Sequence, residues 1–350
     1  MPPESHAPSV RIGHAERAAS PQGTWRAHFA ESVAAHQAVG PDEAPVRTRW
    51  RTRFAPAPTG YLHLGHVANA IFVWGLARAF GGAVVLRLED HDRSRCRPAF
   101  EDALLDDLDW LGFEADIAPT SFYRLTSEGA RSAPHPYRQS DNDARYVAAL
   151  AVLEQQRLIY PCTCTRRDIA SLVPRTTGEE ARYPGTCRDA HGDPASTLAR
   201  RMLLDDTVES FVDLRLGAMT QQPSAQCGDL LVRDRSGGWT YQFAVAVDDA
   251  AHGIDVIIRG EDLLSSTGRQ RQLSRRLGRV RLPLVLHHPL LVHASGEKLS
   301  KANGDTAVRE RRRAGATAAA LIGEAAHLAG LTTSRAPMDA RDVASLFLVT

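Results

Sequence analysis

The sequence predicts an α/β fold built around a parallel sheet. Residues 51–88 change pattern in the order strand, tight turn, helix, glycine pair and buried strand. Two strands joined by a helix in this way form a βαβ unit, and the strands of such a unit run parallel. The chain has 350 residues, of which 43% are hydrophobic and 24% are charged. That is enough for one large globular domain or two modest ones.

Prolines and glycines mark the limits of the first elements. Residues 51–55 form the predicted first strand, which Pro56 and Pro58 end. Residues 63–80 carry apolar side chains at helical spacing, and the glycine pair that follows ends this helix. Residues 83–88 then form a fully apolar strand that ends in two acidic residues.

The rest of the chain is less regular. Helical patterns occupy residues 99–111 and 143–156, and the prolines between them predict a loop over 113–140. Residues 165–225 lack periodicity, which indicates a small inserted unit. Further strands are predicted at 230–233, 241–247, 255–259 and 284–286, and an alanine-rich helix near 317–331. Residues 1–47, rich in Ala, Pro, His and Ser, are predicted to be a mobile N-terminal extension, and a short helix at 24–39 is the alternative for part of it.

Composition excludes several classes of protein. Lys+Arg number 42 and Asp+Glu 41, so bulk positive charge does not predict a nucleic-acid coat, although a local basic patch stays possible. No apolar run reaches the ~18 residues of a membrane span, and the first residues lack the apolar core of a signal peptide. Five cysteines do not make a disulfide scaffold in a chain this long. We therefore expect a soluble, cytoplasmic protein without a membrane partner.

The turn at residues 56–66 is the first candidate site. It lies where a helix begins after the first predicted strand, and free N–H groups at such a position bind anions. His63 and His66 are three apart on the first helical turn, so both rings can face one phosphate. Gly60 and Gly65 allow a nucleotide to approach the backbone closely. Spacing alone leaves half a metal site and two surface histidines as alternatives.

A lysine pair in the segment 295–301 is the second candidate. Lys298 and Lys301 are three apart in a loop after an apolar strand. A compact ammonium charge suits the neutralisation of phosphate charge that builds up in a transition state. By itself such a loop is more often a solvated surface.

Together these segments resemble the two signature sequences of the class I aminoacyl-tRNA synthetases. The signatures are residues 53–60 (RFAPAPTG) with 63–66 (HLGH), and residues 298–301 (KLSK). Four more blocks are similar to the glutamyl branch of that family and occur in its order: 86–93 (LRLEDHDR), 137–140 (YRQS), 241–249 (YQFAVAVDD) and 258–263 (IRGEDL). The resemblance extends from about Thr48 to about Leu331.

The resemblance implies a domain plan. In that family a Rossmann-type parallel sheet is split by an inserted acceptor-binding unit. The expected parts are a first half of the catalytic domain at 48–157, an inserted zinc-bearing unit at 158–227, a second half with the lysine loop at 228–305, and a short helical C-terminal segment at 306–350. No anticodon-binding domain is expected.

The resemblance also implies a glutamate site. Its residues would be Arg53, Ala57, Glu89, Tyr241 and Arg259. The chemistry fits, because a guanidinium offers two parallel donors to a carboxylate, Glu89 can pair with the α-ammonium, and Tyr241 supplies a phenol donor. Arg53 and Glu89 have a purely structural alternative, in which they tie strand ends together. At Ala57 the family usually has serine, and the missing hydroxyl would cost about 0.5–1.5 kcal/mol of binding.

The nucleotide site follows from the two signatures. ATP, with Mg²⁺, would be bound by Pro58, Gly60, His63, Gly65, His66 and Lys301. Catalysis would depend on His63, His66, Lys298 and Lys301, with Lys301 stabilising the α-phosphate as carboxylate attacks and pyrophosphate leaves.

A cysteine cluster predicts one structural zinc ion. Cys162, Cys164 and Cys187 fall within 26 residues, a spacing typical of zinc ligands in a chain without disulfides. Buried cysteines without a ligand are the alternative. From chemistry alone the fourth ligand stays open among Tyr183, Asp189 and His191. The resemblance favours Tyr183 and leaves His191 as second choice.

Chain length then indicates which subfamily the chain resembles. Only 49 residues follow Lys301, too few for the anticodon-reading domain of a full glutamyl-tRNA synthetase at ~100–150 residues. With the zinc motif, this length resembles the glutamyl-queuosine subfamily, which activates L-glutamate with ATP without tRNA and transfers it to the queuosine base at the wobble position of tRNA(Asp). The alternatives are a truncated paralogue with another acceptor and a non-catalytic tRNA-binding relative.

The arginine-rich run 309–313 fits either a contact with RNA phosphate or a solvated helix face.

Overall fold

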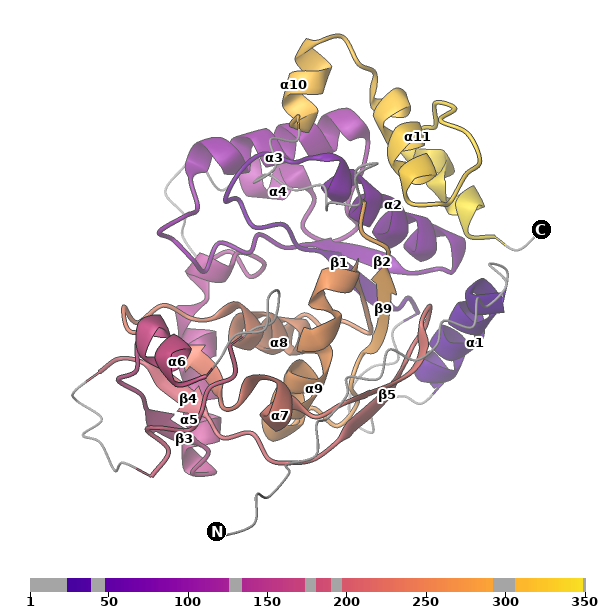
Figure 1. Cartoon of the computed structure of the whole chain (residues 1–350). Helices are drawn as coiled ribbons and strands as arrows, with labels where there is room; N and C mark the ends of the chain where they lie inside the picture. The colour runs from indigo at the N-terminus through magenta and orange to yellow at the C-terminus, as the bar shows by residue number, and fades with distance from the viewer. Residues whose placement is uncertain are drawn as a thin grey trace, which may run out of the picture.

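A central sheet with helices on both faces forms the larger part of the molecule (Figure 1). The structure is a computed structural model, and it describes residues 24–38, 48–125, 134–173, 181–189, 197–291 and 306–348. Helices α2 (Leu64–Ala79) and α3 (Pro98–Leu111) cover one face of the sheet, and α8 (Tyr241–Ala251) and α9 (Thr267–Arg276) cover the other. This layering is the doubly covered arrangement expected of a parallel sheet.

The central sheet consists of a strand pair and a group of four. Its strands are β1 (Arg51–Phe54), β2 (Ala83–Leu86), β5 (Glu209–Asp213), β6 (Gly217–Gln221), β8 (Val256–Gly260) and β9 (Leu284–His288). β1 pairs with β2 in parallel, and β9 pairs in parallel with both β8 and β5. The N–H of Asp255 donates to the carbonyl of Arg51 at 2.9 Å and joins β1 to the β8 side. The prediction of a parallel sheet is thus confirmed, while antiparallel β6 makes one edge mixed.

Helix α2 is the centre of the core. It packs between the sheet and two C-terminal elements, α11 (Ala318–Leu328) and the 3₁₀ helix η5 (Ala340–Leu346). Gly75 is required at the contact, because a Cβ there would lie 2.2 Å from a ring carbon of Phe347. The C-terminal segment therefore rests directly on the helix that carries His63 and His66 at its start.

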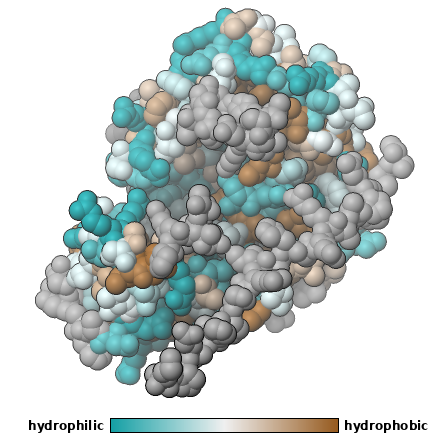
Figure 2. Space-filling view, in the orientation of Figure 1, coloured by the Kyte–Doolittle hydropathy of each residue, from teal (hydrophilic) through white to brown (hydrophobic). Residues whose placement is uncertain are grey.

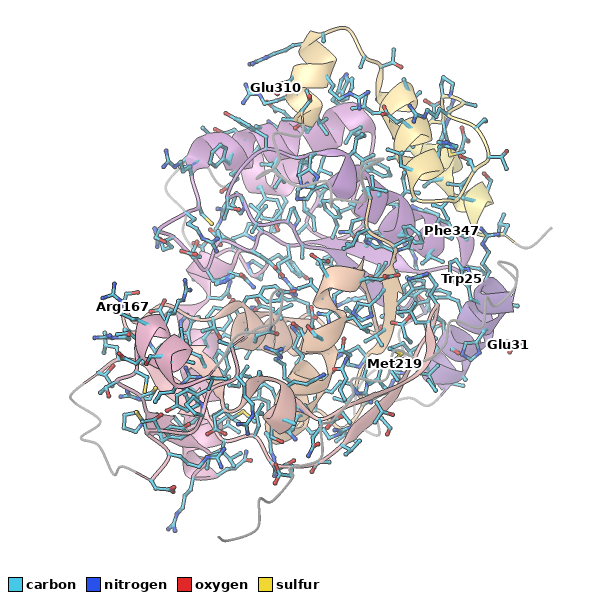
Figure 3. The ribbon with its side chains drawn as sticks, in the orientation of Figure 1. Trp25, Glu31, Arg167, Met219, Glu310 and Phe347 are labelled. Atoms are coloured by element: carbon cyan, nitrogen blue, oxygen red, sulfur yellow. The ribbon has the colours of Figure 1, made fainter. Side chains whose placement is uncertain are left out.

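Part of the N-terminal extension is a packed helix, which corrects the prediction of a mobile segment. Helix α1 (Thr24–Ala38) buries Phe29 completely, with its ring 5.7 Å from that of Trp50. Trp25 meets Phe347 edge to face at 6.2 Å, so the two ends of the described chain lie together (Figure 3). These few large aromatic contacts order a helix whose composition carries no amphipathic signal. The rest of the extension, 1–23 and 39–47, lies outside the described residues.

A smaller sheet lies beside the central one. It is antiparallel, in the order β3 (Ile159–Pro161), β4 (Arg200–Met202) and β7 (Leu230–Arg233). Helices α5 (Asp143–Gln155), α6 (Arg166–Leu172) and α7 (Pro223–Cys227) belong to the same part of the chain. The pairing differs from the predicted inserted unit at 158–227, because β7 follows that range and yet completes the small sheet. β5 and β6 fall inside the range and join the central sheet instead.

The predicted strand at 241–247 is wrong, because these residues form the start of helix α8. Two valines, a tyrosine and a phenylalanine in the stretch favour a strand by propensity. Tertiary packing decides otherwise, since Phe243, Ala244 and Val247 all face a core formed with α5 and α9. A helix also places the acidic pair at 248 and 249 inside the molecule, where the cations described below meet it.

The remaining elements are short. In the predicted loop over 113–140, Thr120–Leu125 form α4, and the 3₁₀ helices η1 and η3 occupy Gln139–Asp141 and Glu261–Ser266. Helix α10 (Val308–Arg313) contains the arginine-rich run, and hydrophilic residues gather over it at the top of the molecule in Figure 2. In the stretches that the structure describes, none of the helices has the length and apolarity needed to cross a membrane.

Candidate active site

A cavity of about 580 Å³ lies at the carboxyl ends of β1 and β8, beside the first turn of α2. Ligands of α/β sheets bind at this edge. Most of the predicted site residues line the cavity: Arg53, Glu89, Tyr241 and Arg259 of the glutamate set, and His63, Gly65 and His66 of the nucleotide set. The structure therefore gathers side chains from five separate segments of the chain into one pocket.

Three other residues predicted for glutamate or ATP do not line this cavity in the described structure. Ala57, Pro58 and Gly60 lie in the turn between β1 and α2, where the carbonyl of Ala57 accepts the N–H of Thr59 at 2.8 Å. Ala55 lines the cavity in their place. Lys298 and Lys301 lie outside the described residues. The missing hydroxyl at residue 57 is thus set back from the predicted glutamate side chains.

Buried ion pairs hold two of the pocket residues. Arg53 Nε donates to Asp249 Oδ1 at 3.1 Å, and Arg53 Nη1 donates to the carbonyl of Ile258 at 3.2 Å. Arg87, which is fully buried, bridges Asp249 at 2.7 Å and Glu89 Oε1 at 2.8 Å. Burial alone would raise the pKa of Asp249, but Arg53 and Arg87 outweigh it and hold that pKa at about 2. The purely structural alternative for Arg53 and Glu89 is thus partly realised, since both belong to an ion-pair network.

The ion-pair network nevertheless leaves one hydrogen-bonding atom of Arg53 and one of Glu89 outside these contacts. Within the described stretches, Nη2 of Arg53 and Oε2 of Glu89 form none of these contacts. Both residues line the cavity. A guanidinium donor and a carboxylate acceptor therefore remain at the wall of one pocket.

Arg259 is held by three neutral acceptors. Its Nη1 donates to Gln270 Oε1 at 2.7 Å, its Nη2 to Thr267 Oγ1 at 2.8 Å, and its Nε to His287 Nε2 at 3.0 Å. His287 in turn contacts Asp213 Oδ2 through Nδ1 at 2.6 Å. Because Nε2 accepts from arginine, the proton of His287 lies on Nδ1 and is donated to the carboxylate. Burial lowers the pKa of His287 and the pKa of Arg259.

Tyr241 stands at the start of α8 and lines the same cavity. Burial raises the pKa of its phenol, and the negative charge of Glu89 raises it further. The hydroxyl therefore stays protonated and can donate a hydrogen bond to a carboxylate ligand.

The two histidines cap helix α2. His63 Nδ1 accepts the N–H of Gly65 at 3.1 Å, and His66 Nδ1 accepts the N–H of His63 at 3.2 Å. Their ring centroids are 4.1 Å apart. Since both Nδ1 atoms accept, a neutral ring carries its proton on Nε2 in each case. Two N–H donors at a helix N-terminus suit phosphate oxygens.

The cysteine cluster has the dimensions of a zinc site. Cys164 and Cys187 Sγ are 3.5 Å apart, and the hydroxyl of Tyr183 lies 3.6 Å from Cys162 Sγ and 4.0 Å from Cys164 Sγ. A tetrahedral ion with Zn–S bonds of about 2.3 Å separates its ligands by roughly 3.8 Å. Arg201 Nε also donates to Cys162 Sγ at 3.2 Å. The residues present therefore fit the metal.

Tyr183 is the described side chain that completes this cluster. Its hydroxyl accepts the N–H of Cys187 at 2.9 Å, which fixes the oxygen among the sulfurs. His191 lies outside the described residues. Asp189 is not part of the cluster as described.

Sequence reasoning missed several residues of the pocket. Asn69, Asp262 and His288 also line it, and His288 Nε2 lies 3.1 Å from Asn69 Oδ1. It also missed the support of Arg259 by His287 and Asp213 described above. The usable signal was the histidine pair at the end of an apolar strand, an unusual place for polar side chains.

Comparison with known proteins assigns the class. The family described as tRNA synthetases class I (E and Q), catalytic domain, matches residues 49–336. The chain belongs to this family.

Its curated relatives share one name within this family. A glutamyl-Q tRNA(Asp) synthetase of Symbiobacterium thermophilum is 38% identical over 306 residues, which cover 84% of this chain and 91% of the relative. The protein of the same name from Nitratidesulfovibrio vulgaris is 37% identical over 85% and 91% of the two chains. That of Burkholderia cenocepacia strain J2315 is 42% identical over 74% and 82%. The resemblance to the glutamyl-queuosine subfamily is thereby confirmed.

A solved structure agrees on the fold. The glutamate tRNA ligase of Elizabethkingia meningosepticum, crystallised with its amino acid, superimposes with a TM-score of 0.67 at 22% identity. The match covers 85% of this chain and 65% of the other, so this chain spans just under two thirds of that protein. The class I synthetase α/β fold is confirmed.

Proposed function

We propose that this chain activates L-glutamate with ATP in the absence of tRNA and then transfers the glutamyl group to the queuosine base at the wobble position of tRNA(Asp). One observation carries the proposal: a single cavity holds two fixed guanidiniums, a carboxylate and a phenol beside the N-terminus of a helix. The names of the relatives supply the acceptor.

The amino acid is the first ligand. Arg53 offers Nη2 to a carboxylate. Arg259, held by three neutral acceptors and hydrogen-bonded to Tyr241, adds a second fixed guanidinium charge. Oε2 of Glu89 accepts from the α-ammonium. Tyr241 donates its phenolic hydrogen. Two guanidiniums against a single carboxylate favour glutamate over a neutral side chain, because an amide would leave a buried charge unpaired.

Activation is a phosphoryl-centred displacement. The α-carboxylate attacks the α-phosphorus of ATP, which enters with Mg²⁺, and pyrophosphate leaves. His63 and His66 donate from Nε2 to phosphate oxygens at the start of α2, and positioning of the two substrates supplies much of the rate. Lys298 and Lys301 neutralise the charge that develops on the α-phosphate and the leaving group.

A structural zinc ion completes the proposal. Cys162, Cys164, Tyr183 and Cys187 would hold one Zn²⁺, as the spacing of their atoms allows. A closed site of this kind stabilises the fold around it and takes no part in the reaction. The unit it supports is the expected place for the RNA.

The test follows labelled glutamate onto tRNA(Asp) prepared with and without queuosine, each lacking its 3′-terminal adenosine. Incorporation confined to the queuosine-bearing RNA is the expected result, because the reaction needs the modified base and not the 3′ end. Glutamate-dependent pyrophosphate exchange, measured without tRNA, reports the activation step separately. A Lys301→Ala variant, expected to lose exchange, serves as the inactive control.

Other outcomes identify the alternatives. Exchange without incorporation would indicate a truncated paralogue that passes glutamate to a different acceptor. Absence of both activities would indicate a non-catalytic tRNA-binding relative. Incorporation that requires the 3′-terminal adenosine would indicate ordinary aminoacylation.

A further inference from the structure

His91 lies at the edge of the glutamate pocket. It follows the pocket residue Glu89 by two positions, and its ring centroid is 6.5 Å from that of Tyr241. The side chain is half-buried, so solvent or a second substrate can reach it. The proposed activation step gives this histidine no role.

A buried network sets the position of the proton on His91. Its Nδ1 lies 2.6 Å from Gln139 Oε1, and Gln139 Nε2 donates to Asp248 Oδ2 at 2.8 Å. Arg145 and Tyr146 also donate to Asp248, at 2.6 and 2.8 Å, which marks it as an acceptor. Asp248 thus takes the amide nitrogen of Gln139 and turns the amide oxygen toward His91. That oxygen can only accept, so Nδ1 of His91 carries the hydrogen.

The consequence is an unprotonated Nε2 on a fixed ring. In the described residues, no hydrogen bond engages Nε2 of His91. A neutral imidazole with one nitrogen held by a partner and the other open has the form of a general base.

The other imidazoles of this region are already engaged. His63 and His66 use Nδ1 to cap α2 and direct N–H groups to the phosphate side. His287 lies between Arg259 and Asp213, and His288 contacts Asn69. Glu89 is paired with a buried arginine.

We infer that His91 is the general base of the transfer step, an inference that rests on the proposed function. A hydroxyl of the queuosine base attacks the carbonyl carbon of glutamyl-adenylate and gives its proton to Nε2 of His91. A new ester C–O bond forms while the bond from the carbonyl carbon to the AMP oxygen breaks. AMP leaves with the electron pair, and the imidazolium returns its proton to solvent.

The experiment separates the two steps in a His91→Gln variant and a His91→Ala variant. Pyrophosphate exchange reports activation and needs no acceptor. Single-turnover transfer from preformed glutamyl-adenylate to queuosine-bearing tRNA(Asp) reports the second step. We expect exchange within about twofold of the parent and transfer slower by about a hundredfold, the lower end of general-base effects. Added imidazole should restore part of the transfer rate to His91→Ala and leave exchange unchanged.

A matched variant controls for histidine loss as such. His28 is exposed on α1, so His28→Gln should leave both steps unaltered. Equal transfer rates in the parent and His91→Gln would overturn the inference, as would parallel loss of exchange and transfer without imidazole rescue, which indicates a structural role. If the parent itself fails to transfer glutamate, both the proposed function and this inference are wrong. The two variant results above would overturn only the role of His91.

Discussion

At the scale of single residues, the pocket depends on charged side chains that pair with one another. Arg53, Arg87, Glu89 and Asp249 form a continuous buried network, and all four come from motif blocks quoted from the sequence. The motifs could therefore identify the residues that face the ligand. They could not reveal which atoms of each side chain are already engaged, because Asp249 reaches Arg53 only when α8 folds as a helix.

Asp213 offers a test of how Arg259 is positioned. Its carboxylate accepts hydrogen bonds from Nδ1–H of His287 and from the backbone N–H groups of Arg215 and Leu216. A side chain with N–H donors of its own at this position would therefore face other donors. In an Asp213→Asn variant the amide N–H₂ group faces one of these donors. If it faces His287, it favours the tautomer with the proton on Nε2, and that N–H then points at the guanidinium of Arg259. We expect the KM for glutamate in pyrophosphate exchange to rise about tenfold or more, since bonds to charged groups contribute about 1.5–3 kcal/mol.

The KM for ATP provides the internal control for this variant. It should stay within about twofold, because the phosphate side of the pocket is built on α2 and not on β9. Equal loss for both substrates, or a lower melting temperature that accounts for the change, would contradict a specific effect on Arg259.

At the scale of elements, the sequence was most informative where local and tertiary preferences agree. β1, α2 and β2 are bounded by glycines or prolines and carry apolar residues at the spacing of a buried strand or helix. All three form as predicted. α8 fails this rule, because its valines favour a strand while its packing surface requires a helix. α1 carries almost no pattern, and its order comes from Phe29 and Trp25 meeting aromatic rings far along the chain.

The zinc-binding element gives a direct prediction. The purified chain should contain about one Zn²⁺ by elemental analysis, and a Cys187→Ser variant should lose most of it, because three ligands hold the ion far less well than four. Chelation should also raise the protease sensitivity of the unit around β3 and β4, which flank the cluster. Cys96 lies elsewhere, so Cys96→Ser should keep the metal. A parent protein without metal would disprove the zinc site.

At the scale of the whole molecule, the last helices return to the first catalytic turn. The N–H of Val308 donates to the carbonyl of Leu62 at 2.8 Å, and the guanidinium of Arg309 lies 4.4 Å above the ring of Tyr61. The arginine-rich run of α10 is thus partly used in packing, which the sequence left open between RNA contact and solvated surface. No local pattern predicts such a return, because the two segments are more than 240 residues apart.

This docking buries an acidic group whose titration should contribute to the pH dependence of stability. Asp107 of α3 is 2% exposed, and its Oδ2 has no hydrogen-bond partner in the described part of the chain. Burial raises the pKa of Asp107 to about 6, against an ordinary 3.8, although Arg309 and Arg312 lower it somewhat. Between those two values the folded chain holds a proton that the unfolded chain releases, so this carboxyl lowers stability as pH rises through about 4 to 6.

An Asp107→Asn variant should therefore gain most above pH 6. We expect its free energy of unfolding to exceed that of the parent by up to about 3 kcal/mol at pH 7 and by little at pH 4, since one pKa unit corresponds to about 1.4 kcal/mol. Urea unfolding at pH 4, 5, 6 and 7 measures the difference, and Asp102→Asn, exposed on the same helix, is the control. A stabilisation of Asp107→Asn that is the same at every pH would show that titration of Asp107 is not its cause. A loss of stability at pH 7 would show that the arginines of α10 need the ionised carboxylate to hold the C-terminal helices in place.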